Sequence, residues 1–360
     1  LWIKKHEPSS YEKIYQVLLP KDYIRLRITG ECGTDITDAS ATLAFDTKHR
    51  TWSDELILKL GLDPRFYPLV KNPADIAGQV SAHAASETGL YQGTPVVYGG
   101  GDQPMQAIGN GITDPGQVSI TIGTGGQVFS VISEPKYDRE LRTHTFCNAI
   151  PGTWNIMGAS LAAGLSLSWL NKNILSDFSY EGINDLAASV SPGSEGLIFL
   201  PYLIGERTPH MDAAARGTFL GLTLKHNRAH LIRSVMEGVV FALRDSIEIF
   251  KSLNVKMDTF IASGGGARSD IWLKMQANIL NQEVYKVNQL EQACVGAAII
   301  AGTGVNIYRS VQEACQTIIR FSDRPAVPNP HDVQVYNEIY EVYKEAYQRN
   351  KLLFHRLAAI

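Results

Sequence analysis

Cysteines are few in this sequence, and long apolar runs are absent from it. Cys32, Cys147, Cys294 and Cys315 are widely separated and form no Cys-x-x-Cys pair. Their spacing fits neither a zinc site nor a disulfide framework, so reduced thiols in a cytoplasmic protein are the simpler interpretation. Without a long uncharged apolar run, the sequence also contains no segment suited to spanning a bilayer, and no membrane partner is expected.

The chain carries little net charge. Its 33 lysine and arginine residues and 36 aspartate and glutamate residues leave a net charge of -3. No broad basic field is available to attract nucleic acid, so nucleic acid is not an expected partner. Hydrophobic residues make up 44% of the 360 residues, which can fill a sizeable core, and this length favours two lobes.

Expected strands and helices alternate along much of the chain, with one hairpin, which predicts an α/β fold with a mixed sheet. The turn at 113–116 marks the expected boundary between a first lobe, 1–113, and a second lobe, 114–360. The expected strands are 96–98, 118–122, 128–132, 154–157, 197–200, 259–262 and 284–287. The expected helices are 1–22, 54–62, a helix after 158–160 that ends near 170, 230–253, 269–280, 291–301 and a tail from 331 onward.

Three of the expected strands end in glycine clusters, at 99–101, 123–126 and 264–266. Glycine has no Cβ, so the backbone can approach a ligand closely there and present free N–H groups to a phosphate. Thr124, at the tip of the expected hairpin, adds a hydroxyl that can donate to phosphate oxygen. For any one cluster, an ordinary strand-to-helix turn is the simpler interpretation. None fits the dinucleotide-binding or P-loop glycine pattern, which argues against an oxidoreductase.

Asp102 directly follows the first glycine cluster. A carboxylate at the end of a strand is well placed to face a cleft, where it could accept a proton from a substrate hydroxyl during phosphoryl transfer. The alternative is an aspartate that caps the following helix. Local sequence leaves both interpretations open.

Four segments of the chain stand out together: VYGGGDQ at 97–103, SITIGTGG at 119–126, residues 221–222 together with 230–237, and SGGGARS at 263–269. In this order they resemble the FGGY family of carbohydrate kinases. Three further strings, LPY at 200–202, GERTPH at 205–210 and RG at 216–217, are similar to the xylulokinase branch of that family.

The resemblance implies a two-lobe, actin/hexokinase-like (ribonuclease H-like) fold and an ATP-dependent sugar kinase that converts a ketopentose, D-xylulose, to its 5-phosphate. It implies that Asp102 is the general base and that Gln103 lies beside the sugar. Mg²⁺ would be carried by ATP, without assigned protein ligands. The implied ATP-binding residues are Gly123, Thr124, Gly125, Gly126, Gly158, Gly265, Gly266, Ala267 and Asp270.

The sequence departs from the family pattern at its start. The family begins with a strand and an Asp-x-Gly-Thr phosphate loop, whereas this chain begins at Leu1, near the family's first signature. We therefore expect the N-terminal lobe to be incomplete and this polypeptide alone to phosphorylate sugar poorly. Other members of the family, such as a ribulokinase or glycerol kinase, and a non-catalytic sugar or nucleotide sensor remain alternatives. The charge-rich tail helix is expected to be a solvated face, with a homodimer contact as the alternative.

Overall fold

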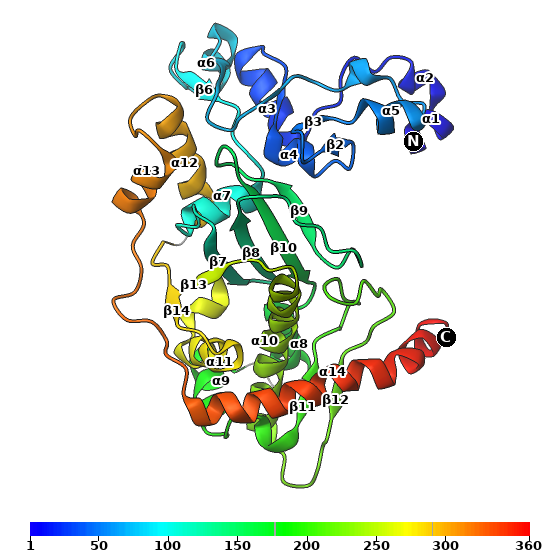
Figure 1. The fold of residues 1–360 in the computed structure, drawn as a ribbon, viewed down its shortest axis with the longest axis vertical. Helices are drawn as coiled ribbons and strands as arrows, with labels where there is room; N and C mark the ends of the chain where they lie inside the picture. Colours follow the sequence, from blue (N-terminus) through cyan, green and yellow to red (C-terminus); the bar gives the residue numbers. More distant parts are fainter. Residues whose placement is uncertain (176–177, 290) are drawn as a thin grey trace.

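The computed structural model describes residues 1–175, 178–289 and 291–360. Figure 1 shows three parts: the N-terminal third at the top, a sheet in the middle and a long C-terminal helix crossing below it. The sheet has six strands in the order β14-β13-β7-β8-β10-β9. Parallel and antiparallel neighbours occur together in it, as the sequence predicts.

The expected hairpin is the centre of that sheet. β7 (Gly116–Ile122) pairs antiparallel with β8 (Gly126–Ile132), and Ile122 lies opposite Gly126 at the tip. β13 (Met257–Ser263) runs parallel to β7, so the second and third glycine clusters follow strands that end at the same edge. The other strands of the sheet are β9 (His144–Cys147), β10 (Trp154–Ser160) and β14 (Val284–Lys286).

Two long helices build the core below the sheet. α10 (Arg228–Ser252) is the helix that the apolar spacing predicts over 230–253, and it is buried along most of its length. It begins two residues earlier than predicted, after Asn227 as its N-cap. α14 (Pro330–Ala358) is the predicted tail helix, and it contributes buried tyrosines whose hydroxyls bond to buried carboxylates. The remaining elements of this part are α8 (Gly164–Asn173), α9 (Tyr180–Ala188), η2 (Ser194–Gly196), β11 (Ile198–Leu200), β12 (Thr218–Leu220), η3 (Gly265–Arg268) and α11 (Asp270–Leu280).

The N-terminal third is made of short elements and two-stranded sheets. The expected single helix over 1–22 is wrong, because Pro8 and Pro20 each start a new helix and a proline lacks the N–H that would continue an earlier one. The elements are α1 (Trp2–His6), α2 (Pro8–Tyr11), α3 (Pro20–Thr29), β1 (Thr34–Asp35), α4 (Ile36–Ser40), β2 (Phe45–Asp46), β3 (Thr51–Trp52), α5 (Asp54–Lys59), η1 (Pro64–Phe66), β4 (Val70–Lys71), β5 (Ile76–Gln79), α6 (Ala82–Thr88) and β6 (Pro95–Val97).

Two helices far apart in sequence touch through their backbones. α7 (Asp102–Gly109) packs on α12 (Gln292–Gly304), beside which α13 (Val311–Ile318) lies in Figure 1. A Cβ at Gly109 would overlap the carbonyl of Gln292, and a Cβ at Gly296 would overlap that of Met105. Glycine at both positions therefore permits this close crossing. No helix in the three described stretches is long and apolar enough to cross a membrane.

Candidate active site

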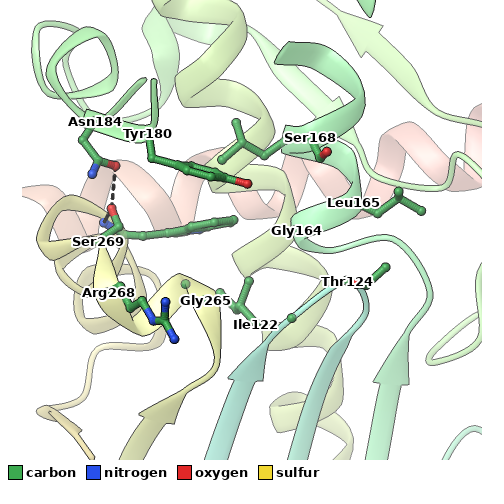
Figure 2. Close-up of a pocket in the computed structure, with 14 residues that line it drawn as sticks. Ile122, Thr124, Gly164, Leu165, Ser168, Tyr180, Asn184, Gly265, Arg268 and Ser269 are labelled. Carbon is green, nitrogen blue, oxygen red and sulfur yellow. Dashed lines mark hydrogen bonds between the residues drawn. The ribbon is translucent and has the colours of Figure 1, made fainter. Parts of the chain in front are cut away.

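The glycine turns at the ends of β7 and β13 open on a cavity of about 480 Å³. Figure 2 shows this cavity between the hairpin tip, the start of α8, the start of α9 and the turn before α11. Its volume lies within the ordinary range of small-molecule sites. The residues that line it are Ile122, Gly123, Thr124, Gly164, Leu165, Leu167, Ser168, Tyr180, Asn184, Gly265, Gly266, Arg268, Ser269 and Trp272.

The two turns meet because β7 and β13 are neighbours. Gly264 has a φ of +75°, and a Cβ there would lie 2.6 Å from the carbonyl oxygen of Ile122. Only glycine allows this combination of conformation and close approach. The expectation that the clusters at 123–126 and 264–266 face one crevice is confirmed for Gly123, Thr124, Gly265 and Gly266.

The hairpin tip is held by the turn that leads into α8. The carbonyl oxygen of Thr124 accepts hydrogen bonds from the backbone N–H groups of Ala163 and Leu165, each at 3.0 Å, and that of Gly123 accepts one from Gly164 at 2.8 Å. The tip therefore keeps its carbonyls turned toward α8, which leaves the side chain of Thr124 exposed at the cavity.

The strand and the helix on either side of this turn have other bounds than the sequence predicts. β10 continues to Ser160, beyond the expected end at 157, and α8 begins only at Gly164.

An aromatic and polar wall closes one side of the cavity. Trp272 is buried, and its Nε1 donates to the carbonyl of Met236 at 3.1 Å, which fixes the indole ring. Tyr180, the first residue of α9, is 73% exposed, and Figure 2 shows its ring reaching over the cavity. A planar base of a nucleotide would find aromatic surface here.

Asn184 lies one helical turn after Tyr180 and presents a polar group to the same cavity. The hydroxyl of Ser269 accepts from the N–H of Trp272 at 3.3 Å as the N-cap of α11, so its own hydrogen is donated to Asn184 Oδ1 at 2.8 Å. This leaves the Asn184 amide nitrogen as a donor for a ligand. The sequence contains no signal for Tyr180 or Asn184, because their place depends on how α9 packs on α11.

Arg268 is the one charged side chain in the lining of this cavity. It is exposed, and it has no hydrogen-bond or ion-pair partner among the residues that the structure describes. A free guanidinium is suited to binding a phosphate group. In the sequence, Arg268 lies in the SGGGARS segment, which by itself gives no signal for a role of the arginine in binding.

Several residues expected at the ATP site lie outside this lining. Ala267 is buried, and Asp270 is exposed in the first turn of α11. Three glycines instead allow close packing within the fold: Gly125 against Ser160, Gly126 against Leu243 and Gly158 against Ser246. The position of Gly158 in β10, against α10, gives no support to the expectation that it lies beside the nucleotide.

Asp102 lies at the start of α7, outside the lining of this cavity. The expected crevice shared by Asp102 and the glycine turns is therefore not formed by these residues alone. The carboxylate is exposed, and Gln103 Nε2 approaches its Oδ2 at 3.5 Å. The alternative that Asp102 caps α7 is wrong, because Gly101 is the N-cap and no side-chain cap hydrogen bond is present.

The described residues show no group of three or more histidine, cysteine, aspartate or glutamate side chains that could hold a metal ion. Mg²⁺ carried by the phosphates of ATP therefore stays a prediction. The guanidinium of Arg268 and the hydroxyl of Thr124 belong to the lining of the cavity, and both suit an anionic ligand.

The mixed sheet and its surrounding helices define the class of the molecule as a two-lobe, actin/hexokinase-like α/β fold. The crystal structure of a xyloylose kinase from Brucella ovis superposes with a TM-score of 0.90 at 34% sequence identity, covering 98% of this chain and 72% of that one. The family models for the N-terminal and C-terminal domains of the FGGY carbohydrate kinases match residues 1–109 and 118–305. The chain belongs to the FGGY family of carbohydrate kinases.

Curated relatives from one organism illustrate the similarity. The xylulose kinase of Bacillus subtilis (strain 168) is 36% identical over 351 residues, which cover 98% of this chain and 70% of the relative. The gluconokinase of the same strain is 31% identical over 314 residues, covering 83% of this chain and 60% of that relative. The higher identity and the longer match are with the xylulose kinase.

Proposed function

We propose that this carbohydrate kinase transfers the γ-phosphoryl group of ATP to a ketopentose, D-xylulose, and forms D-xylulose 5-phosphate. The observation that carries the proposal is the cavity in which two glycine turns, a free arginine and an aromatic wall meet. Such a set of groups suits a nucleotide with its phosphates at the turns and its base at the wall. The choice of D-xylulose rests on similarity to xylulose kinases.

In this proposal the chain's own residues position the nucleotide and the acceptor. The hydroxyl of Thr124 binds a phosphate oxygen, and Arg268 offsets the charge of the phosphates. Asp102 accepts the proton of the terminal sugar hydroxyl as that oxygen attacks phosphorus, and Gln103 orients the sugar. Mg²⁺ carried by ATP would neutralise part of the charge of the phosphates.

Coupled detection of ADP release tests this proposal. D-Xylulose, D-ribulose, glycerol and gluconate are compared as acceptors in the protein expressed at its natural length, with D-xylulose expected to give the highest kcat/KM. D102N should lower kcat by at least about 100-fold, in line with loss of a general base, and should leave ATP binding nearly unchanged. Near-parental turnover of D102N would remove Asp102 from the base role.

A second candidate function is that of a sensor which binds sugar and nucleotide without turnover. The exposed position of Asp102, outside the cavity, is the observation that favours it. Calorimetric binding of ATP and D-xylulose with no ADP release would establish the sensor.

We also propose a cytoplasmic location, because all four cysteines are unpaired.

A further inference from the structure

The segment Tyr98–Gly101, which leads directly into Asp102, is held at both of its ends by buried side chains of the N-terminal third. At the first end, Arg25 Nη1 donates to the carbonyl oxygen of Tyr98 at 3.3 Å, and its guanidinium lies 4.5 Å from the centre of the Tyr98 ring. At the other end, the backbone N–H of Gly101 donates to Thr37 Oγ1 at 2.8 Å. The peptide that carries Asp102 is therefore bound immediately before the carboxylate.

The two ends are connected through a continuous chain of ion pairs and hydrogen bonds. Arg25 Nη1 and Lys21 Nζ both bind Asp22 Oδ1 at 2.8 Å. Lys21 Nζ also lies 2.7 Å from Asp35 Oδ2. Asp35 in turn binds Thr37, which closes the path from the Tyr98 carbonyl to the Gly101 amide. We call Lys21, Asp22, Arg25, Asp35 and Thr37 the clamp.

Thr37 has its hydroxyl orientation determined by Asp35. Both the backbone N–H of Thr37, at 2.8 Å, and its hydroxyl donate to Asp35 Oδ1. A hydroxyl has a single hydrogen, so Thr37 Oγ1 can meet the N–H of Gly101 only as an acceptor. Donor and acceptor roles are therefore assigned without ambiguity along this path.

Four of the five clamp residues are buried. Asp22 and Asp35 are fully buried, and Arg25 and Thr37 are each 4% exposed, whereas Lys21 is partly exposed. Within the clamp, the carboxylates of Asp22 and Asp35 pair with Lys21 and Arg25. Buried ion pairs of this kind add little net stability compared with apolar packing, so stability alone does not explain the clamp.

Asp38 adds a steric limit on the same segment. A Cβ at Gly101 would lie 2.8 Å from Asp38 Oδ1, and one at Gly100 would lie 3.1 Å from Thr37 Oγ1. Asp38 Oδ2 also lies 3.4 Å from Lys21 Nζ. The backbone before Asp102 thus lies directly against α4, where a sideways shift would meet side chains that are themselves bound.

We infer that Thr37 is a positioning residue for Asp102, acting through the Gly101 amide and supported by the rest of the clamp. The inference rests on the proposed role of Asp102 as general base. Displacement of a reacting group by about 1 Å can reduce a rate by about 100-fold, so a bound backbone next to the base has a direct effect on turnover. Thr37 itself touches neither sugar nor nucleotide in this assignment.

The test compares T37V, which keeps the shape of the side chain and removes the hydroxyl, with T37S, which keeps the hydroxyl. T42V is the matched control, because Thr42 lies just beyond α4 and bonds only to nearby backbone groups. In the protein at its natural length, T37V should lower kcat by about 10-fold or more with KM for ATP within about twofold of the parent. T37S should keep kcat within about threefold of that of the parent, and T42V should have the same kcat as the parent.

Amide hydrogen exchange of peptides that contain residues 98–103 supplies a readout independent of turnover. T37V should speed exchange there while peptides from α10 and the central sheet keep parental rates. Parental kcat in T37V, or unchanged exchange in 98–103, overturns the inference. D102N is assayed in parallel: if D102N turns over normally, the proposed base is wrong, whereas an inactive D102N beside a fully active T37V disproves the positioning role alone.

Discussion

The hydroxyl of Ser160 donates a 2.7 Å hydrogen bond to the buried carboxylate of Glu206. The other carboxylate oxygen of Glu206 accepts from the backbone N–H groups of Leu161 and Arg207, at 2.9 and 2.7 Å. A Cβ at Gly125 would lie 2.9 Å from the carbonyl oxygen of Ser160. Glu206 therefore supports, from behind, the backbone against which the hairpin tip of the cavity packs. The guanidinium of the neighbouring Arg207 is hydrogen-bonded to His144 Nε2 at 2.8 Å.

Glu206 should make stability depend on pH. Burial raises the pKa of its carboxyl from 4.5 to about 7, although its hydrogen bonds act in the opposite direction. A carboxyl with a raised pKa in the folded state favours folding when protonated, so this contribution is complete below about pH 4.5 and is lost as pH rises through about 7. From pH 5 to 8, the free energy of unfolding of the parent should fall relative to that of E206Q by on the order of 2 kcal/mol.

Urea unfolding of the parent and E206Q at pH 5, 6, 7 and 8 measures this difference. Asp245 titrates in the same range, since burial also raises its pKa to about 7. D245N is therefore included so that the two carboxyls can be separated. Parallel curves for the parent and E206Q would contradict the assignment to Glu206.

Gly265 and Gly266 should respond differently to alanine, although they are adjacent. A Cβ at Gly265 has the carbonyl oxygen of Ile122 as its nearest neighbour at 3.8 Å, so the methyl group fits and enters the cavity. G265A should raise KM for ATP several-fold and leave the melting temperature unchanged. A Cβ at Gly266 would lie 2.6 Å from Ile122 Cβ, so G266A should lower the free energy of unfolding by about 1–3 kcal/mol.

Differential scanning fluorimetry and steady-state kinetics on both variants provide the measurements. G182A, in the first turn of α9 where Gly182 is partly exposed and a Cβ has only ordinary contacts, is the control for the substitution itself. A destabilised G265A beside a stable G266A would show that the packing around Ile122 differs from the one described.

Tyr180 should contribute to nucleotide affinity without contributing to stability. Its ring lines the cavity and is 73% exposed, so Y180A removes aromatic surface from the site and little from the core. An aromatic contact with a base adds about 1 kcal/mol, which predicts a loss of ATP affinity of roughly three- to tenfold. Y180F should bind like the parent, and Y91A, at an exposed tyrosine in the N-terminal third, should have no effect. Isothermal titration calorimetry with ATP measures these affinities. Equal affinity of Y180A and the parent for ATP would rule out a contact between Tyr180 and the base.

Arg268 should contribute to the binding of ATP but not to the binding of adenosine, which has no phosphate groups. Since its guanidinium belongs to the cavity lining and has no partner among the described residues, R268Q should weaken ATP binding by about tenfold and leave adenosine binding unchanged. The difference between R268Q and the parent should shrink as salt is added, because screening weakens an exposed charge interaction. R356Q, at an exposed arginine near the end of α14, is the control. Equal losses for ATP and adenosine would mean that Arg268 does not contact phosphate.

The parts of the fold that the sequence predicts well are those governed by local chemistry. The hairpin of β7 and β8 follows from alternating β-branched residues around a glycine tip, and α5 starts where Ser53 caps it through the N–H of Leu56. The shared cavity of Gly123 and Gly265 was also predictable, because both turns follow strands of one sheet.

The parts that could not be predicted depend on contacts between distant segments. Asn184 joins the cavity wall through Ser269, which lies 85 residues later. The sequence predicts only a helix over 1–22 for the segment that holds Asp22, yet this carboxylate is fully buried, with Lys21 and Arg25 bound to its Oδ1. Burial of a charge is decided by its partners, and these are visible only once the chain is folded.

The backbone contact between Gly109 and Gln292 ties the helix that begins with Asp102 to a helix nearly two hundred residues away in the sequence. Because no side chains separate the two backbones at this crossing, we expect α7 and α12 to keep their relative positions in the folded protein. A substitution that forces them apart at Gly109 or Gly296 would therefore also displace the helix that carries Asp102.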